Sequence, residues 1–185
     1  KDGTIGREIQ LTNEGIELAR HFGRELRYDI GFIASSSCGR NVQTCRELLF
    51  GRNEIKDICE APDELECPQM KDQKVSDKIF EEFNYQSDVI IHKLKTEGLP
   101  GFNTIEEASK IMLDFIFANG NEANTIDLFC THDLQLAILY AYLFDFSASK
   151  EELEYNKWPM MLEGMLFWGT RNHFWCAWRS QIKEF

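Results

Sequence analysis

A histidine and an aspartate follow a short, mainly apolar run, and these two residues have the clearest potential for chemistry. The run 126–130 is followed directly by Thr131, His132 and Asp133, after which an apolar helical pattern begins. This predicts a strand that enters a helix through a tight turn, and such turns lie at the ligand-binding edge of α/β sheets. A histidine there could act as base, nucleophile or charge stabiliser, and the carboxylate could supply a proton. The alternative is structural, because Asp133 could instead satisfy free N–H groups at the start of the helix.

A second polar turn has the same organisation. The apolar stretch 30–35 is followed by Ser36 and, four residues later, by Arg40 at the start of another helical pattern. The helix dipole disfavours a cation at this position unless the cation meets an anion that the helix end also attracts. Arginine is the residue best suited to bidentate phosphate binding. If both turns share one sheet edge, Arg40 and His132 meet over one anionic ligand with Asp133 close by. A surface arginine on a solvated helix face is the alternative.

The elements that must position these turns follow from the spacing of the apolar residues. Apolar residues at helical spacing predict amphipathic helices, and short apolar runs between them predict buried strands. The expected helices cover about residues 11–26, 40–50, 76–95, 104–119 and 134–144, and the expected strands cover 30–36, 55–59, 125–131, 161–168 and 174–178. This alternation predicts a three-layer α/β/α sandwich with a mainly parallel sheet. The last two strands, joined through residues 170–172, predict an antiparallel hairpin at the edge of that sheet.

Composition narrows the classes of function. The chain has 185 residues and a formal net charge of -11, which disfavours nucleic-acid binding but allows a small phosphorylated substrate in a locally positive pocket. No apolar stretch is long enough to span a membrane. The six cysteines show no spacing typical of a zinc site, so buried free thiols in a reducing, cytoplasmic compartment are expected. They are Cys38, Cys45, Cys59, Cys67, Cys130 and Cys176.

The order of short motifs along the chain resembles that of the histidine phosphatase superfamily. This family includes phosphoglycerate mutases, bacterial phosphohistidine phosphatases and histidine acid phosphatases. The motifs are Leu11-Thr12-x-x-Gly15-x-x-x-Ala19, then Ser36-x-x-x-Arg40-x-x-Gln43-Thr44, and then the late strand that ends in His132. The resemblance covers about residues 10–50 and 104–145. It implies one phosphoglycerate mutase-like α/β domain over residues 1–185, with a cap or insertion at about 60–103.

The resemblance also implies roles for individual residues. Arg40 corresponds to the phosphate-binding arginine, with Ser36 at the start of the same turn. His132 corresponds to the second histidine, which binds and stabilises the transferring phosphoryl group. Asp133 corresponds to the acid that protonates the leaving alcohol in histidine acid phosphatases, whereas mutase-like members usually have glycine there. The aspartate therefore favours a phosphatase over a mutase, and the reaction needs neither a metal nor another cofactor.

The nucleophile of this family is not among the matching residues. It is a histidine in an Arg-His-Gly motif at the end of the first strand, shortly before the Leu-Thr-x-x-Gly helix. Residues 20–23 read Arg-His-Phe-Gly, but they lie inside the predicted helix and cannot end a strand. We expect the nucleophile to lie upstream of Lys1, with residues 1–4 as the loop after it, because losing a central strand would leave its neighbours unpaired. The alternative is a relative that keeps the pocket but lacks the chemistry.

These observations favour a phosphomonoesterase that acts through a phosphohistidine intermediate on a small phosphorylated substrate. The alternatives are a non-catalytic protein that binds a phosphorylated ligand, and a phosphotransferase of the phosphoglycerate mutase type. Neither nucleic acid nor a membrane is expected as a partner. Formation of a homodimer is compatible with the sequence. Near the C-terminus, Trp158, Glu163 and Trp168 are candidates for the rim of the site, although core packing is favoured for both tryptophans.

Overall fold

The computed structural model describes residues 8–120, 122–145 and 158–185. The loop expected at residues 1–4 therefore lies outside the described residues. Two compact units are distinguished by their internal contacts. Unit 1 contains the chain up to Cys67 together with Ala118–His132, and unit 2 contains Pro68–Phe117 together with Asp133–Phe185. None of the helices in the described ranges is both long and apolar enough to span a bilayer.

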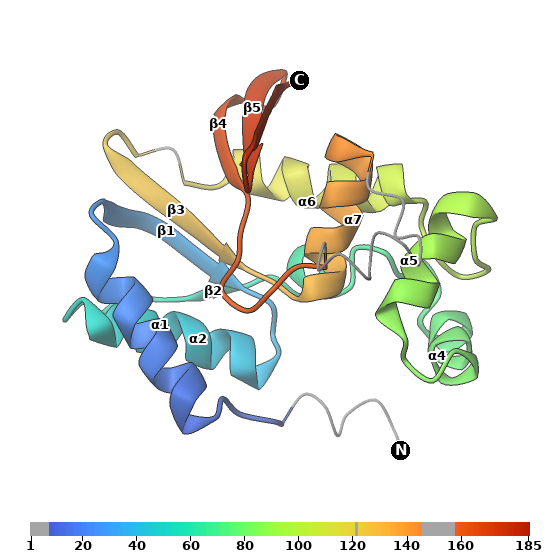
Figure 1. Ribbon diagram of the computed structural model, residues 1–185, viewed down its shortest axis with the longest axis horizontal. Helices are drawn as coiled ribbons and strands as arrows, with labels where there is room; N and C mark the ends of the chain where they lie inside the picture. The colour runs from blue at the N-terminus through green and yellow to red at the C-terminus, as the bar shows by residue number, and fades with distance from the viewer. Residues whose placement is uncertain (1–7, 121, 146–157) are drawn as a thin grey trace. The chain divides into compact units, whose positions relative to one another are not determined.

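Unit 1 is a parallel sheet with helices packed on it (Figure 1). Its elements in chain order are α1 (Asn13–Glu25), β1 (Asp29–Ser35), α2 (Gly39–Gly51), β2 (Cys59–Glu60), α3 (Pro62–Leu65) and β3 (Thr125–Cys130). The strand order is β2-β1-β3. Both pairings are parallel, and Ser35 of β1 is level with Glu60 on one side and with Cys130 on the other. The carboxyl ends of the three strands therefore lie at one edge of the sheet.

The two long helices of unit 1 pack closely against each other. A Cβ atom added at Gly23 of α1 would lie 2.1 Å from the carbonyl oxygen of Leu48 in α2. In the reverse direction, a Cβ atom at Gly51 would lie 2.2 Å from the carbonyl oxygen of Arg20. Only glycine permits backbones to approach this closely. α2 in turn contacts β1 and β3, and the apolar core between them contains Ile30, Ile33, Cys45, Leu48 and Leu49.

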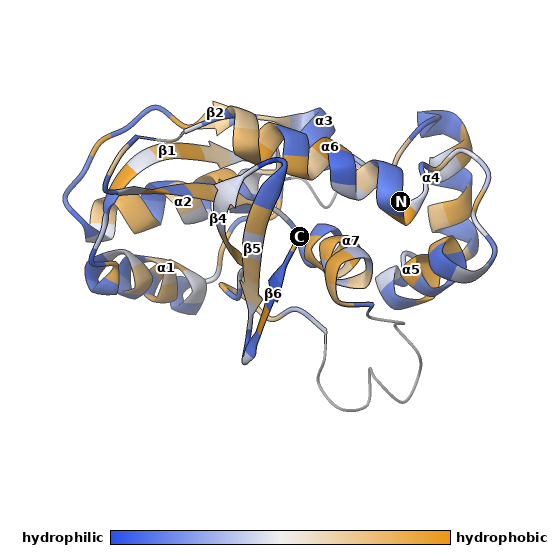
Figure 2. Ribbon diagram, turned by 90° about the horizontal axis from the view of Figure 1, so that it is seen from above, coloured by the Kyte–Doolittle hydropathy of each residue, from blue (hydrophilic) through white to orange (hydrophobic). Residues whose placement is uncertain are grey.

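Unit 2 combines helices with an antiparallel sheet. Its elements are α4 (Gln73–Glu82), α5 (Ser87–Thr96), α6 (Ile105–Ala118), α7 (Asp133–Phe144), β4 (Leu166–Thr170), β5 (His173–Trp178) and β6 (Gln181–Glu184). α7 is apolar around most of its circumference (Figure 2), which matches its burial in the core of this unit. One face of β5 joins the same core through Phe174, Cys176 and Trp178. α6 begins at the capping box expected from its sequence, in which Thr104 and Glu107 exchange hydrogen bonds of 2.8 and 3.1 Å.

The mixed α/β class is confirmed, and four local predictions need correction. The expected helix 76–95 is two helices, because Asn84 and Tyr85 adopt φ angles of 50° and 57°, which an α-helix cannot contain. The strand expected at 55–59 is only the pair Cys59–Glu60. The strand expected at 161–168 begins at Leu166. The antiparallel strands form a sheet of their own, which also contains β6, instead of extending the parallel sheet.

Candidate functional site

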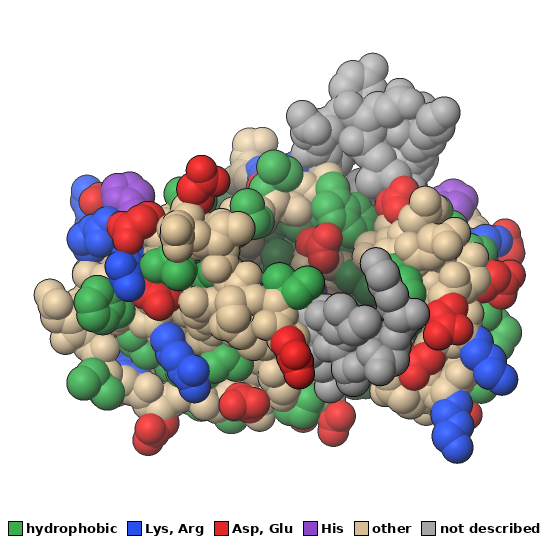
Figure 3. Space-filling view, turned by 90° about the horizontal axis from the view of Figure 1, so that it is seen from below, with side chains coloured by type: hydrophobic (Ala, Val, Ile, Leu, Met, Phe, Trp, Pro, Cys, Tyr) green, Lys and Arg blue, Asp and Glu red, His purple; other side chains and the backbone are tan. Residues whose placement is uncertain are grey.

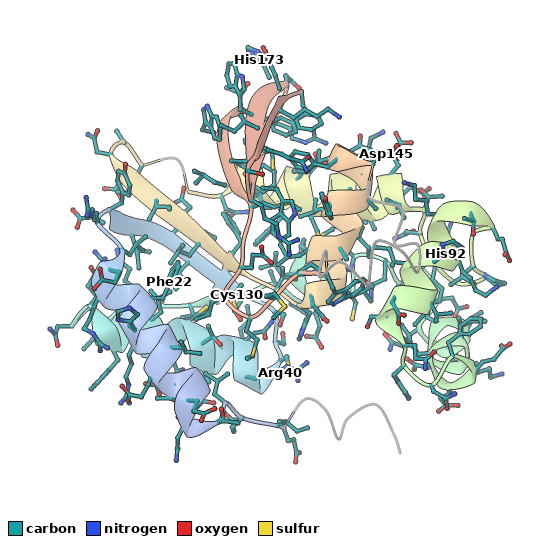
Figure 4. The ribbon with its side chains drawn as sticks, viewed as in Figure 1. Phe22, Arg40, His92, Cys130, Asp145 and His173 are labelled. Carbon is teal, nitrogen blue, oxygen red and sulfur yellow. The ribbon has the colours of Figure 1, made fainter. Side chains whose placement is uncertain are left out.

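The site is built on the carboxyl ends of β1 and β3. Figure 4 shows Arg40 on the first turn of α2 and Cys130 at the end of β3. The backbone N–H of Ser36 donates to the carbonyl oxygen of Cys130 at 3.0 Å, which carries the β1–β3 pairing one step beyond the strand. This bond holds the Ser36 turn beside the His132 turn. The parallel pairing is thus the reason that residues 36 and 132, distant in sequence, lie together.

His132 is held between a hydroxyl group and a guanidinium group. Its Nε2 lies 3.1 Å from Ser36 Oγ, and its Nδ1 lies 3.2 Å from Arg40 Nη2. A guanidinium group can only donate hydrogen bonds, so Nδ1 accepts and carries no proton. The ring proton is therefore assigned to Nε2, which donates to Ser36 Oγ, and the imidazole is neutral in this arrangement. The structure thus brings together three of the residues singled out in the sequence.

The Ser36 hydroxyl group is fixed by buried neighbours. Ser36 has no exposed surface, and its Oγ accepts a hydrogen bond of 2.9 Å from Asn41 Nδ2 on the first turn of α2. The backbone N–H of Cys38 also approaches Oγ, at 3.4 Å. Sequence reasoning missed Asn41, although the signal was present. Asn41, Cys45 and Leu48 share one helix face at helical spacing, so a polar residue on this apolar face required a partner.

The start of α2 is electrostatically suited to an anion. Cys38 precedes the helix and makes no side-chain cap hydrogen bond, and the first turn contains no acidic residue. The positive end of the helix dipole is therefore not balanced by a carboxylate of the helix itself. Arg40 stands in this turn, where its carbonyl oxygen accepts a hydrogen bond of 2.8 Å from Thr44 Oγ1. An arginine, a neutral imidazole and a helix N-terminus can together bind the oxygens of a phosphoryl group.

The glutamine of the second motif links the first two helices. Gln43 Oε1 accepts a hydrogen bond of 2.8 Å from the backbone N–H of Leu11. Thr12 caps α1 by accepting a bond of 3.1 Å from the backbone N–H of Gly15. The Leu-Thr-x-x-Gly and Arg-x-x-Gln motifs therefore have a structural role as well, since they anchor the entry of α1 against α2.

Asp133 is the first residue of α7 and belongs to unit 2. Its Oδ1 accepts a hydrogen bond of 2.9 Å from the backbone N–H of Leu134, one of the free N–H groups at the start of this helix. Its Oδ2 accepts a second bond of 2.8 Å from the indole Nε1 of Trp158. Trp158 also packs against the core of unit 2. The expectation of a packing role for Trp158 was therefore incomplete, because its polar atom contacts a candidate site residue.

The other tryptophan does not have the expected packing role. Trp168 is 40% exposed and stacks on Trp175, with ring centroids 6.3 Å apart and an interplanar angle of 9°. Glu163 forms an ion pair with Arg179, in which Nε and Oε1 are 2.5 Å apart. This pair lowers the pKa of Glu163, mainly through the hydrogen bond that the guanidinium donates.

The cysteines are free thiols and most of them are sheltered. Cys59 is the exception, because it is exposed on β2. Burial raises the pKa of Cys176 to about 12. The Cys45 and Cys130 thiols are hydrogen-bonded, and together with burial this bond raises the pKa of Cys130. Within the described residues, His, Cys, Asp and Glu side chains nowhere gather in a group of three that could hold a metal ion.

The surface charge follows the composition. On the face drawn in Figure 3, acidic and basic side chains are interspersed among polar and apolar ones in the described part of the chain.

Comparison with known proteins identifies the family to which the chain belongs. The sequence model of the histidine phosphatase superfamily (branch 1) matches residues 4–156, which is most of the chain. No curated protein is matched. The native structure of a mycobacterial glucosyl-3-phosphoglycerate phosphatase aligns at 12% identity with a TM-score of 0.49, over 90% of this chain and 77% of that chain. A complex of that phosphatase with inorganic phosphate aligns at 12% identity with a TM-score of 0.46, over 74% and 70% of the two chains. A mycobacterial hydrolase aligns at 13% identity with a TM-score of 0.48, over 78% and 76%. On the strength of the sequence match, the chain belongs to branch 1 of the histidine phosphatase superfamily.

Proposed function

We propose that the protein is a phosphomonoesterase that acts through a phosphohistidine intermediate on a small phosphorylated substrate. The observation that carries this proposal is the contact between the Arg40 guanidinium group and the His132 imidazole. The same imidazole also contacts the Ser36 hydroxyl group. A guanidinium group and an imidazole that share one sheet edge with an uncapped helix N-terminus suit a phosphoryl group. Membership of the histidine phosphatase superfamily supports the same reading.

Each residue has a distinct part in the proposed reaction. Arg40 and the N-terminus of α2 bind the non-bridging oxygens, and His132 stabilises the charge that develops on them. A histidine nucleophile attacks phosphorus while the bond from phosphorus to the ester oxygen breaks, and Asp133 gives its proton to that oxygen. Water then attacks the phosphohistidine, and the Asp133 carboxylate takes the proton from this water. Inorganic phosphate leaves, and histidine and acid return to their starting forms.

The proposal requires a nucleophilic histidine on a strand that precedes Lys1. The place of β3 at the end of the strand order of the described sheet supports such a strand. Among the described residues, β3 is hydrogen-bonded to β1 on one side and to no strand on the other. An additional parallel strand could pair with β3 on that side. It would also end beside His132, at the same edge of the sheet as the candidate site.

Asp133 favours hydrolysis over transfer between two positions of a sugar or glycerate phosphate. The resemblance that assigns this residue as the acid is to the phosphatases with His-Asp, whereas mutase-like members usually have His-Gly. The alternative of a non-catalytic binding protein predicts that the full-length chain binds phosphate but releases none from an ester.

The test is phosphate release from p-nitrophenyl phosphate by the full-length protein and two histidine variants. His132→Ala removes a group that stabilises charge in the transition state, so we expect kcat to fall by about a hundredfold or more. His92→Ala is the matched control, since His92 is exposed on α5 in unit 2, and its kcat should equal that of the unmodified protein. Equal turnover by all three proteins would overturn the role of His132. A full-length protein that binds phosphate without turnover would favour the binding protein.

A further inference from the structure

We infer that Trp158 is a positioning residue for Asp133, whose indole N–H fixes the orientation from which this carboxyl group protonates the leaving oxygen. This inference rests on the proposed function, because it assigns Asp133 the role of general acid. Trp158 lies 25 positions further along the chain, and its Nε1 donates to Asp133 Oδ2 at 2.8 Å. An indole nitrogen is only a donor, so the polarity of this bond is fixed.

The hydrogen bond from Trp158 does more than a helix cap requires. Asp133 Oδ1 already accepts the backbone N–H of Leu134 in the first turn of α7, at 2.9 Å. One bond to its own helix leaves the second oxygen of this exposed aspartate without a defined direction. The contact with Trp158 supplies that direction, because it ties Oδ2 to a separate part of unit 2. Two anchored oxygens restrict the side chain to one rotamer.

Trp158 is itself held firmly. Its ring packs against the core of unit 2. Its carbonyl oxygen accepts a hydrogen bond of 3.0 Å from Arg179 Nη2. The same guanidinium forms a bidentate pair with Glu163, with 2.5 Å between Nε and Oε1 and 2.8 Å between Nη2 and Oε2. Glu163 Oε2 also accepts the backbone N–H of Met160 at 2.9 Å. The backbone that carries the indole is thus fixed from two sides.

The same bond also suits the chemistry of proton donation. As Asp133 transfers its proton, negative charge develops on the carboxylate, and hydrogen bonds to a charged acceptor are stronger than those to a neutral one. The indole bond therefore stabilises the transition state more than the ground state, which is the condition for an effect on kcat. The increase in kcat due to this hydrogen bond should be large only for substrates whose leaving oxygen needs a proton.

The experiment compares two phosphate esters in the full-length protein. Glycerol 3-phosphate has an alkoxide leaving group that needs protonation, whereas p-nitrophenyl phosphate releases a stable phenolate. Trp158→Phe replaces the indole by a smaller aromatic ring that has no N–H. We expect kcat for glycerol 3-phosphate to fall about fivefold with KM unchanged, as for the loss of one hydrogen bond. For p-nitrophenyl phosphate the change should stay below about twofold, because little general-acid catalysis is needed. Trp175→Phe is the matched control and should change neither value, since Trp175 lies in β5 and stacks on Trp168.

Asp133→Asn separates this inference from the proposed function. It should show the same preference for the good leaving group with a loss of about a hundredfold on glycerol 3-phosphate. In the Asp133→Asn background, Trp158→Phe should cause no further loss, because the two residues act through one interaction. If Asp133→Asn slows both esters equally, Asp133 is not the acid and its proposed role is overturned. If Asp133→Asn discriminates between the esters and Trp158→Phe does not, the positioning role is overturned while the proposed function stands.

A second variant keeps the test valid if Trp158→Phe does not fold. Arg179→Lys removes the bidentate contact with Glu163 and loosens the backbone of Trp158 without altering the indole ring. We expect the ratio of kcat for glycerol 3-phosphate to kcat for p-nitrophenyl phosphate to fall about twofold, because the indole would be held less precisely. A loss of equal size on both esters would indicate a structural role only and would overturn the inference.

Discussion

Removal of the Ser36 hydroxyl group would show how the candidate site is held together. Ser36 Oγ is the acceptor for Asn41 Nδ2 at 2.9 Å and lies 3.1 Å from His132 Nε2. Asn41 is only 7% exposed, so its amide has little access to water once this acceptor is gone. A buried donor that loses its partner destabilises a protein by about 1–3 kcal/mol. We therefore expect Ser36→Ala to lower the free energy of unfolding by about 2 kcal/mol.

A double-mutant cycle identifies the interaction responsible. Asn41→Ala alone leaves Ser36 without its buried donor, whereas Ser36→Ala with Asn41→Ala removes both partners together. The loss in the double variant should therefore be smaller than the sum of the two single losses, by about 1 kcal/mol. Urea denaturation followed by tryptophan fluorescence measures these free energies.

The neighbouring residue supplies the control. Ser37 is half-buried, and among the described residues the structure gives its hydroxyl group no hydrogen bond. Ser37→Ala should change the free energy of unfolding by no more than about 0.5 kcal/mol. A loss below about 0.5 kcal/mol for Ser36→Ala, or strict additivity in the cycle, would refute the claim that this buried hydrogen bond supports the site.

Three further predictions concern charge, thiol reactivity and helix packing. The pKa of Glu163 is lowered by its arginine partner, so its ionised form stabilises the fold above about pH 4.3, and this contribution is lost as the pH falls through the lower folded-state pKa. Glu163→Gln should therefore flatten the acid side of a plot of Tm against pH, and an unchanged acid side would speak against the ion pair. Iodoacetamide at pH 7.5 should label the exposed Cys59 and spare Cys176, because burial raises the pKa of Cys176 to about 12. Equal labelling of the two cysteines in a peptide map would contradict this prediction. Gly23→Ala places a Cβ atom 2.1 Å from the carbonyl oxygen of Leu48, so α1 and α2 must separate. We expect the free energy of unfolding, measured by urea denaturation, to fall by about 2 kcal/mol. An unchanged midpoint would refute the close packing of the two helices.

The sequence was informative wherever local chemistry decides the structure. Thr12 and Thr104 begin helices because their side chains satisfy free backbone N–H groups within three residues. β1 and β3 are short apolar runs that end in polar turns, and the rule for parallel sheets then brings the Ser36 and His132 turns to one edge. The contact of Arg40 with His132 follows from that rule, although it joins residues 92 positions apart.

The sequence was less informative where a structural feature depends on contacts between distant residues or on the backbone conformation of a loop. The break between α4 and α5 depends on positive φ angles at Asn84 and Tyr85, and no glycine or proline marks it. The hydrogen bond from Trp158 to Asp133 joins residues 25 positions apart in the chain. A tryptophan near the C-terminus carries no local signal of such a partner. Local patterns therefore predicted most of the longer elements and the two turns, but not the break between α4 and α5 or the contact that anchors Asp133.

The most direct test of the central claim is to trap the phosphorylated enzyme. The full-length protein is mixed with labelled p-nitrophenyl phosphate, quenched in alkali within one turnover, and mapped by peptide mass spectrometry. We predict an acid-labile, alkali-stable phosphoryl group on a histidine that precedes Lys1, with its formation slowed about a hundredfold or more by Arg40→Ala or His132→Ala. Turnover with no phosphohistidine, or a phosphoryl group on a serine or an aspartate, would contradict the proposed mechanism.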